Sequence, residues 1–169
     1  MAHVKILVPY GAVGLNCSDE AFANGLALQP DIICCDAGST DSGPYYLGTG
    51  KGKYMTAAVK RDLRRMVKGA HALGVPMAIG SAGTCGSNAG VDEAVRLIQE
   101  ICQEENIHGK KIVKIYTEQE PAKMAAYYKA GKVQALAGAP EITAETFGEC
   151  DHIVALSGAE PFQKALEMG

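Results

Sequence analysis

The chain is organised around one long polar loop: Asp36-Ala37-Gly38-Ser39-Thr40-Asp41-Ser42-Gly43-Pro44-Tyr45-Tyr46-Leu47-Gly48-Thr49-Gly50-Lys51. It follows the apolar run Ile32 to Cys35 and precedes a long pattern of helical spacing. Two aspartates, four glycines, two tyrosines and several hydroxyl side chains lie within it. A connection of this length in a compact domain is more often functional than idle. The sequence therefore predicts a site in this loop.

The composition is that of an ordinary globular domain. The 169 residues are 47% hydrophobic and 21% charged, which allows one domain, residues 1–169, with a sizeable core. A formal net charge of −3 gives no reason to expect nucleic acid or an anionic membrane as a partner. No apolar run is long enough to span a bilayer, and the first residues lack the layout of a secretory signal. We therefore expect a cytoplasmic protein.

The cysteines fit the same compartment. None of the six belongs to a Cys-x-x-Cys pair or has a histidine at the spacing of a zinc ligand. Cys34 and Cys35 lie within an expected strand, where a free thiol behaves as a small hydrophobic group. The sequence predicts no metal site and a reducing environment.

Apolar runs alternate with helical patterns along the whole chain. We expect strands at 3–9, 31–36, 76–80, 111–116 and 152–156, and helices at 18–28, 54–73, 91–105, 121–130 and 161–167. Residues 133–147 are the least regular segment. Near-continuous apolar strands that alternate with helices are typical of a buried parallel sheet. The predicted fold is α/β: a three-layer, doubly wound, mostly parallel five-stranded sheet, Rossmann- or flavodoxin-like, with helices on both faces.

The loops that follow the strands are expected at one edge of this sheet. Right-handed crossovers bring them to the carboxyl edge, where ligands bind in such folds. These loops are 10–17, 36–53, 80–90, 116–120 and 157–160, and most are rich in glycine or hydroxyl side chains. Their convergence predicts a ligand site.

The long loop holds the expected catalytic residues. Asp36 leaves a buried strand directly at the ligand edge and is suited to act as a general base or to hold a metal. The alternative is an ordinary turn residue, because aspartate binds nearby backbone N–H groups. We expect Asp36, Ser39, Thr40 and Asp41 to position or deprotonate a substrate. The residues expected to contact it from the same loop are Gly38, Tyr45, Tyr46 and Lys51.

A second glycine-rich turn, from Gly80 to Gly90, precedes a helix. The start of a helix offers free backbone N–H groups and a positive dipole end, which suit a carboxylate or phosphate. We expect an anion to bind through Gly80, Ser81, Gly83, Thr84 and Ser87. The alternative is that Ser87 or Asn88 caps the helix and the glycines allow close packing.

Other motifs leave alternatives open. The turn Gly11 to Gly14 follows the first strand but lacks the dinucleotide glycine spacing, so it is either a nucleotide site or a plain turn. Cys85 lies near a helix start and is a possible nucleophile. Glu118 is either an acid–base group or a helix N-terminal charge. The same alternatives apply to Glu160, which we group with Ser157 as substrate-binding residues after the last strand.

The chain also resembles a known family. Asp36 to Gly48, Val59-Lys60-Arg61-Asp62-Leu63, Gly80-Ser81-Ala82-Gly83 and Ser157-Gly158-Ala159-Glu160-Pro161-Phe162 are similar to the acyclic terpene utilisation (AtuA-like) family. The resemblance runs in register from the first strand to the last helix. It implies a catabolic protein that acts on branched acyclic terpenes or related carboxylic acids. Family members continue beyond the segment that matches Pro161-Phe162, which implies a partner chain or a missing C-terminal segment here.

Together these observations predict an enzyme, or the substrate-binding half of one. Its substrate is expected to be a small carboxylate or acyl thioester, and its chemistry that of a lyase or hydratase. The expected partners are a small anionic metabolite and further copies of the chain; the cofactor is left open. Two alternatives remain: a non-catalytic subunit that binds a partner chain, and a nucleotide-binding domain.

Overall fold

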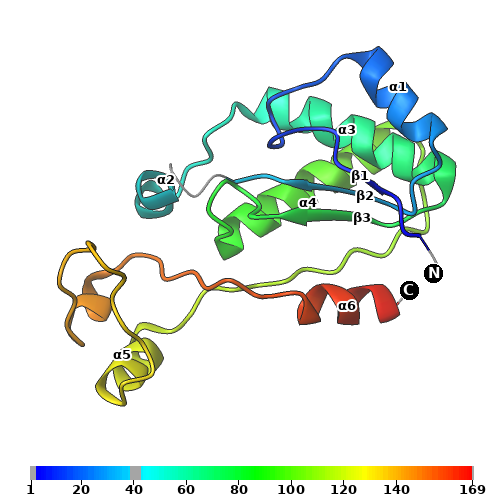
Figure 1. Ribbon diagram of the computed structural model, residues 1–169. Coiled ribbons are helices and arrows are strands. Elements are labelled where there is room, and N and C mark those ends of the chain that lie inside the picture. The colour runs from blue at the N-terminus through cyan, green and yellow to red at the C-terminus, as the bar shows by residue number, and fades with distance from the viewer. Residues whose placement is uncertain (1–2, 39–42, 169) are drawn as a thin grey trace.

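The computed structural model of the protein describes residues 3–38 and 43–168 (Figure 1). The described part of the first 104 residues contains three strands and four helices, and the named elements after them are all helical. In chain order the elements are β1 (Ile6–Leu7), α1 (Asp19–Ala27), β2 (Ile32–Asp36), α2 (Gly43–Thr49), α3 (Thr56–Leu73), β3 (Met77–Gly80), α4 (Asn88–Glu104), α5 (Pro121–Lys129), the 3-10 helix η1 (Thr146–Glu149) and α6 (Glu160–Glu167). The predicted α/β class is confirmed.

A small parallel sheet forms the centre of the fold. Its three strands lie in the order β1-β2-β3. Ile6 of β1 pairs with Ile32 of β2, and Asp36 at the end of β2 pairs with Gly80 at the end of β3. The spatial order follows the chain order without a reversal, so the described sheet lacks the switch point of a doubly wound fold.

The expectation of five strands is corrected: within the described residues, 111–116 and 152–156 do not join the sheet. Both runs have the apolar composition of strands, but a strand needs a neighbour for its backbone N–H and C=O groups. In the first run, Lys114 and the Tyr116 hydroxyl bind the Asp92 carboxylate of α4. The second run makes one isolated antiparallel bridge, Glu118 to Val154.

The expectation of helices on both faces is also corrected, because α1, α3 and α4 cover the same face. A Cβ built at Gly69 of α3 would lie within 3.3 Å of Phe22 of α1 and Ile33 of β2. Ile33 shares its core cluster with Ile101 of α4. The reason is the strand order: successive right-handed crossovers that step in one direction place their helices on one side.

The opposite face of the sheet is partly open. Side chains of paired parallel strands point to the same side, so Ile6 shares this face with Ile32. Ile6 is 60% exposed, and Val4 and Val8, on either side of it, are 70% and 58% exposed. Parallel sheets are normally covered on both faces. This open face is therefore an unusual feature of the described chain.

The ends of several helices lie where local signals place them. The Ser18 hydroxyl accepts a hydrogen bond from the Ala21 N–H at 3.1 Å and caps α1. Gly74 ends α3 in the left-handed conformation, as a C-terminal cap. One helix is not among those that the sequence predicts: α2 lies in the middle of the long loop. Its Pro44 suits the first helical turn.

The chain after α4 forms a sparse second region. Tyr128 of α5 and Phe147 of η1 have ring centroids 5.8 Å apart, and Phe147 is the buried hydrophobic residue described there. Figure 1 shows α5 and η1 beside each other, away from the sheet. In the described residues, no helix is both long enough and apolar enough to cross a membrane.

Candidate functional site

The loops after the three strands meet at the carboxyl edge of the sheet, as predicted. The Ala37 N–H donates to the Gly80 carbonyl at 2.8 Å and continues the β2–β3 ladder by one residue. The Val13 N–H donates to the Asp36 carbonyl at 2.9 Å and adds the loop after β1. These backbone bonds bring three separate segments to one place.

Asp36 lies at the centre of this edge with an exposed side chain. Its Oδ1 accepts a hydrogen bond from the Gly38 N–H at 2.8 Å, which is an Asx turn. Gly38 is held against the neighbouring loop, since a Cβ built there would lie 2.3 Å from the Thr84 carbonyl oxygen. Only glycine permits this approach. The expected catalytic residues Ser39, Thr40 and Asp41 lie outside the described residues.

The loop after β3 is the most strained segment near Asp36. Ser81 and Thr84 adopt positive φ angles of 46° and 84°. Neither residue type favours this left-handed region, which costs free energy of order 1–3 kcal/mol per residue. Gly83 turns back onto the first turn of α4, where a Cβ on it would lie 2.5 Å from the Gly90 Cα. Strain of this kind is typical of ligand sites.

Thr84 ties a fourth segment to the same edge. Its side chain is 4% exposed, and its Oγ1 accepts a hydrogen bond from the Lys53 N–H at 2.8 Å. Lys51 and Lys53 are therefore held near the strained loop, and both are exposed. Thr84 thus positions this basic segment, while the exposed Ser81 remains accessible to a ligand.

The start of α4 already has protein partners. The Ser87 hydroxyl accepts from the Gly90 N–H at 3.2 Å, and Glu118 Oε1 accepts from the Asn88 N–H at 3.0 Å. These are two of the donors that we expected an anion to use. The geometry matches the alternative interpretation, in which Ser87 caps the helix and the glycines allow close packing.

Glu118 lies beside His152, a residue that the sequence analysis does not identify as functional. Its Oε1 lies 3.2 Å from Nδ1 of His152. A Cβ built at Gly50 would lie 3.8 Å from Nε2 of the same ring, so His152 borders the basic segment. His152 is the first residue of 152–156, an apolar run with the composition of a strand. No motif in the neighbouring sequence marks it as functional. Only the pairing of the two distant segments places it here.

The residues expected from the last loop are not brought to Asp36 by any described contact. The Ser157 hydroxyl donates to the adjacent Gly158 carbonyl at 3.2 Å, and Glu160 begins α6. Figure 1 shows α6 below the strands, on the side away from α2. Since 152–156 does not form a parallel strand, the loop after it does not reach the carboxyl edge.

The two tyrosines of the long loop lie on α2. Their rings pack edge to face at 5.1 Å, and Tyr45 is exposed whereas Tyr46 is half-buried. Cys85 is half-buried, and its Sγ lies 4.0 Å from the Gly83 carbonyl oxygen. No described contact joins Cys85 to a general base.

The turn after β1 is occupied by a side chain from α3. Asp62 is fully buried, and its Oδ2 accepts from the Gly14 N–H at 2.9 Å and the Asn16 N–H at 3.0 Å. A nucleotide phosphate would need backbone donors of this kind. Burial and the nearby Asp62 raise the pKa of Tyr10, whose hydroxyl donates to the Asp62 carbonyl. The turn is therefore fixed by the protein itself.

Two other ionisable groups near the edge are structural. Burial raises the pKa of the Cys35 thiol to about 11, and that of Cys34 also rises through burial. Both therefore stay protonated at neutral pH.

Among the described residues, no group of three His, Cys, Asp or Glu side chains is arranged to hold a metal ion.

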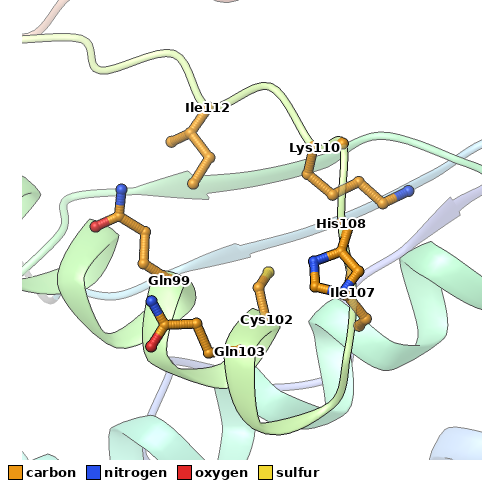
Figure 2. Close-up of a pocket in the computed structure, with 8 residues that line it drawn as sticks. Gln99, Cys102, Gln103, Ile107, His108, Lys110 and Ile112 are labelled. Carbon is orange, nitrogen blue, oxygen red and sulfur yellow. The ribbon is translucent and has the colours of Figure 1, made fainter.

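The described cavities lie away from this edge. A pocket of about 410 Å³ lies between the end of α4 and the segment after it. Figure 2 shows the side chains that line it. Gln99, Cys102 and Gln103 line it from the helix, with His108 and Ile112 opposite. Because α4 runs back from the carboxyl edge, this pocket lies at the opposite end of the sheet. A second pocket lies between α1 and α3.

Comparison with known proteins gave no relative: no family model, no curated protein and no solved structure matches this chain.

Proposed function

We propose that the carboxyl edge of the sheet binds a small branched carboxylate or acyl thioester and catalyses lyase or hydration chemistry on it. The observation that carries this proposal is the strained pair Ser81 and Thr84, held directly against the Asp36 turn. Backbone strain beside an exposed carboxylate at the end of parallel strands favours a ligand site over a purely structural turn.

The charges at this edge support an anionic substrate. Lys51 and Lys53 follow α2 and are exposed, and the Lys53 backbone is fixed to Thr84. An ammonium group attracts a carboxylate most strongly where water is partly excluded. We assign recognition of the substrate's anionic end to these lysines rather than to the start of α4, where Glu118 and Ser87 already occupy two N–H donors.

The proposed role of Asp36 is that of a base. Its side chain is exposed, and one oxygen is oriented by the Gly38 N–H, which fixes the carboxylate relative to the sheet. A positioned carboxylate can remove the proton next to a carbonyl group, the first step of an elimination.

The resemblance to the acyclic terpene utilisation family supports branched acids as the substrate class. The free cysteines support a reducing, cytoplasmic location.

A thermal-shift measurement tests the binding part of the proposal. The probes are isovalerate, methylsuccinate and isovaleryl coenzyme A, each with wild type, Asp36→Asn and Glu20→Gln. At a hundred times its dissociation constant a ligand stabilises the fold by about 2.7 kcal/mol. We expect one probe to raise the melting temperature of wild type and of Glu20→Gln, an exposed control on α1. The shift should be lost in Asp36→Asn, and a shift that persists there would show that Asp36 does not contribute to binding. No shift from any probe would refute the proposed substrate class.

One observation favours a second candidate function, that of a subunit. The open face with Val4, Ile6 and Val8 leaves a parallel sheet uncovered on one side. We propose that a second copy of the chain covers it, because an apolar patch is complementary to itself in a two-fold dimer.

Analytical ultracentrifugation tests the dimer. Wild type should sediment as a dimer, Ile6→Glu as a monomer, and Leu136→Glu, an exposed control in the second region, as a dimer. A monomeric wild type would contradict the dimer and leave the face to a different chain.

A further inference from the structure

His152 and Glu118 are brought together by a short antiparallel pairing of two distant segments. The Gln119 N–H donates to the Ile153 carbonyl at 2.8 Å, and the Ala155 N–H donates to the Thr117 carbonyl at 3.0 Å. These two bonds flank Glu118 and Val154, and they bring His152, two residues before Val154, next to Glu118. The geometry is therefore built by backbone contacts rather than by flexible side chains.

Glu118 is held on its other side by α4. Its Oε1 accepts the Asn88 N–H at 3.0 Å, at the first residue of the helix. The positive end of the helix dipole stabilises the ionised carboxylate at this position. The same oxygen lies 3.2 Å from His152 Nδ1. One carboxylate thus joins the start of α4 to the imidazole.

The two nitrogens of His152 lie in different surroundings. Nδ1 is buried, and although it is near Glu118 it lacks a partner with hydrogen-bond geometry. Such contacts are often loose before a substrate binds and tighten in the complex. Nε2 points toward Gly50, at the start of the basic segment, and 28% of the side chain is exposed. The ring therefore turns one nitrogen to the carboxylate and the other toward the lysine segment.

This pair also borders the strained loop. The Thr117 hydroxyl donates to the Gly86 carbonyl at 3.4 Å, and a Cβ on Gly86 would lie 3.8 Å from Val154 and 3.6 Å from the Ser81 Cα. Ser81 is the residue that approaches Gly38 in the Asp36 turn. Asp36 and His152 thus border the same loop, from β2 on one side and from the second region on the other.

We propose that His152 is the second acid–base residue of this site and that Glu118 positions it. The inference rests on the proposed function, which needs one group to take a proton and another to give one. Asp36 accepts the proton from the carbon next to the carbonyl, and the C–H electron pair forms the new double bond. The C–O bond of the β-hydroxyl group breaks, and the oxygen keeps that electron pair. It takes a proton from His152 Nε2 and leaves as water; hydration is the reverse.

A described contact places the carboxylate of Glu118 against Nδ1 of His152, and the uncharged Gly50 lies next to Nε2. A carboxylate beside one ring nitrogen orients an imidazole and leaves the other nitrogen to face a substrate. Glu118→Gln removes this charge and keeps an oxygen that can accept the Asn88 N–H. It therefore separates the effect on His152 from the effect on the helix.

Carbethoxylation with diethyl pyrocarbonate, followed by peptide mass spectrometry, tests the proposal on the whole chain. The reagent attacks accessible neutral imidazoles, and His71 on α3 is the exposed internal control. We expect His152 to react, and the probe that raises the melting temperature to slow its reaction about a hundredfold at a hundred times the dissociation constant. His71 should react equally with and without the probe.

Each outcome decides a separate point. If a probe shifts the melting temperature through Asp36 but leaves the reaction of His152 unchanged, the proposed function stands and the role of His152 is wrong. A His152 that does not react at all also overturns it. If no probe binds, both proposals fall together. In Glu118→Gln the probe should still raise the melting temperature but should no longer protect His152 from the reagent; protection equal to that in wild type would rule out the positioning role.

Once a turnover assay exists, His152→Asn should lower kcat about 10²- to 10⁴-fold, the range of a lost acid–base group. His71→Asn should leave kcat unchanged.

Discussion

The part of the chain before residue 108 and the part after it contain similar apolar runs, but they use them differently. In the first part, Ile33 and Cys35 alternate into a core with Leu63 and Ile101. In the second part, Val113 is 43% exposed and Leu156 is 99% exposed. The first part supplies its own partners, three strands and the helices that cover them. The second places the Glu118–His152 pair against the start of α4 and buries little of itself. Composition thus marks where a strand can form, and pairing decides whether it does.

The largest expected effect comes from Asp62, which fixes the first part. Asp62→Ala leaves the N–H groups of Gly14 and Asn16 and the partly exposed Arg61 without their carboxylate partner. Breaking a buried charged network of this kind costs about 3–5 kcal/mol of unfolding free energy. Urea denaturation followed by circular dichroism measures the loss. A loss below about 1 kcal/mol would show that the turn does not depend on this side chain.

The next largest effect is expected when an apolar residue of the first part is replaced by alanine, and the same change in the second part is the comparison. Leu63→Ala removes a fully buried side chain and should cost about 2–5 kcal/mol. Val113→Ala lies in a run of strand-like composition and should change the unfolding free energy by no more than about 0.5 kcal/mol. The same urea titration measures both. Equal losses would mean that 111–116 is buried in the folded protein, and the contrast between the two parts would fail.

A smaller effect tests how tightly the loops of the site are packed. Gly38→Ala forces a methyl group to within 2.3 Å of the Thr84 carbonyl oxygen, and the overpacking should cost about 1–3 kcal/mol. Gly80→Ala is the matched control, because its nearest described atom, Asp36 Oδ1, would lie 3.9 Å away. Differential scanning calorimetry should show a lower melting temperature for Gly38→Ala alone. If both variants melt alike, the Asp36 turn does not lie against the Thr84 loop.

Much of the first part could be predicted from local patterns, and little of the second. The cap at Ser18, the end of α3 at Gly74 and the emergence of Asp36 at the carboxyl edge follow from short-range rules. Asp62 and His152 act through contacts with residues far along the chain, which no local pattern records.

The number of strands is a related failure. Five apolar runs predict a five-stranded sheet, but the runs alone do not specify which strand pairs with which.

The smallest expected effect is a loss of thermal stability at acid pH. Lys60, Arg64 and Lys68 of α3 bind Glu100, Glu104 and Glu105 at the end of α4, and these hydrogen bonds lower the pKa of each glutamate. A carboxyl group with a lowered pKa stabilises the fold above its unfolded value and loses that contribution as the pH falls through its folded value. We therefore expect a modest fall in melting temperature below about pH 4 that is weaker in 1 M salt and in Glu104→Gln. A fall that salt does not alter would place its cause elsewhere.

A map of amide chemical shifts in ¹⁵N-labelled protein, recorded as isovalerate, methylsuccinate or isovaleryl coenzyme A is added, shows where on the molecule such a ligand binds. We expect the shifts to concentrate on Gly38, Gly50, Ser81 and His152, which come from both parts of the chain and meet at the carboxyl edge. Shifts confined to the residues lining the pocket at the end of α4, from Gln99 to Ile112, would contradict the account and move the site to the opposite end of the sheet.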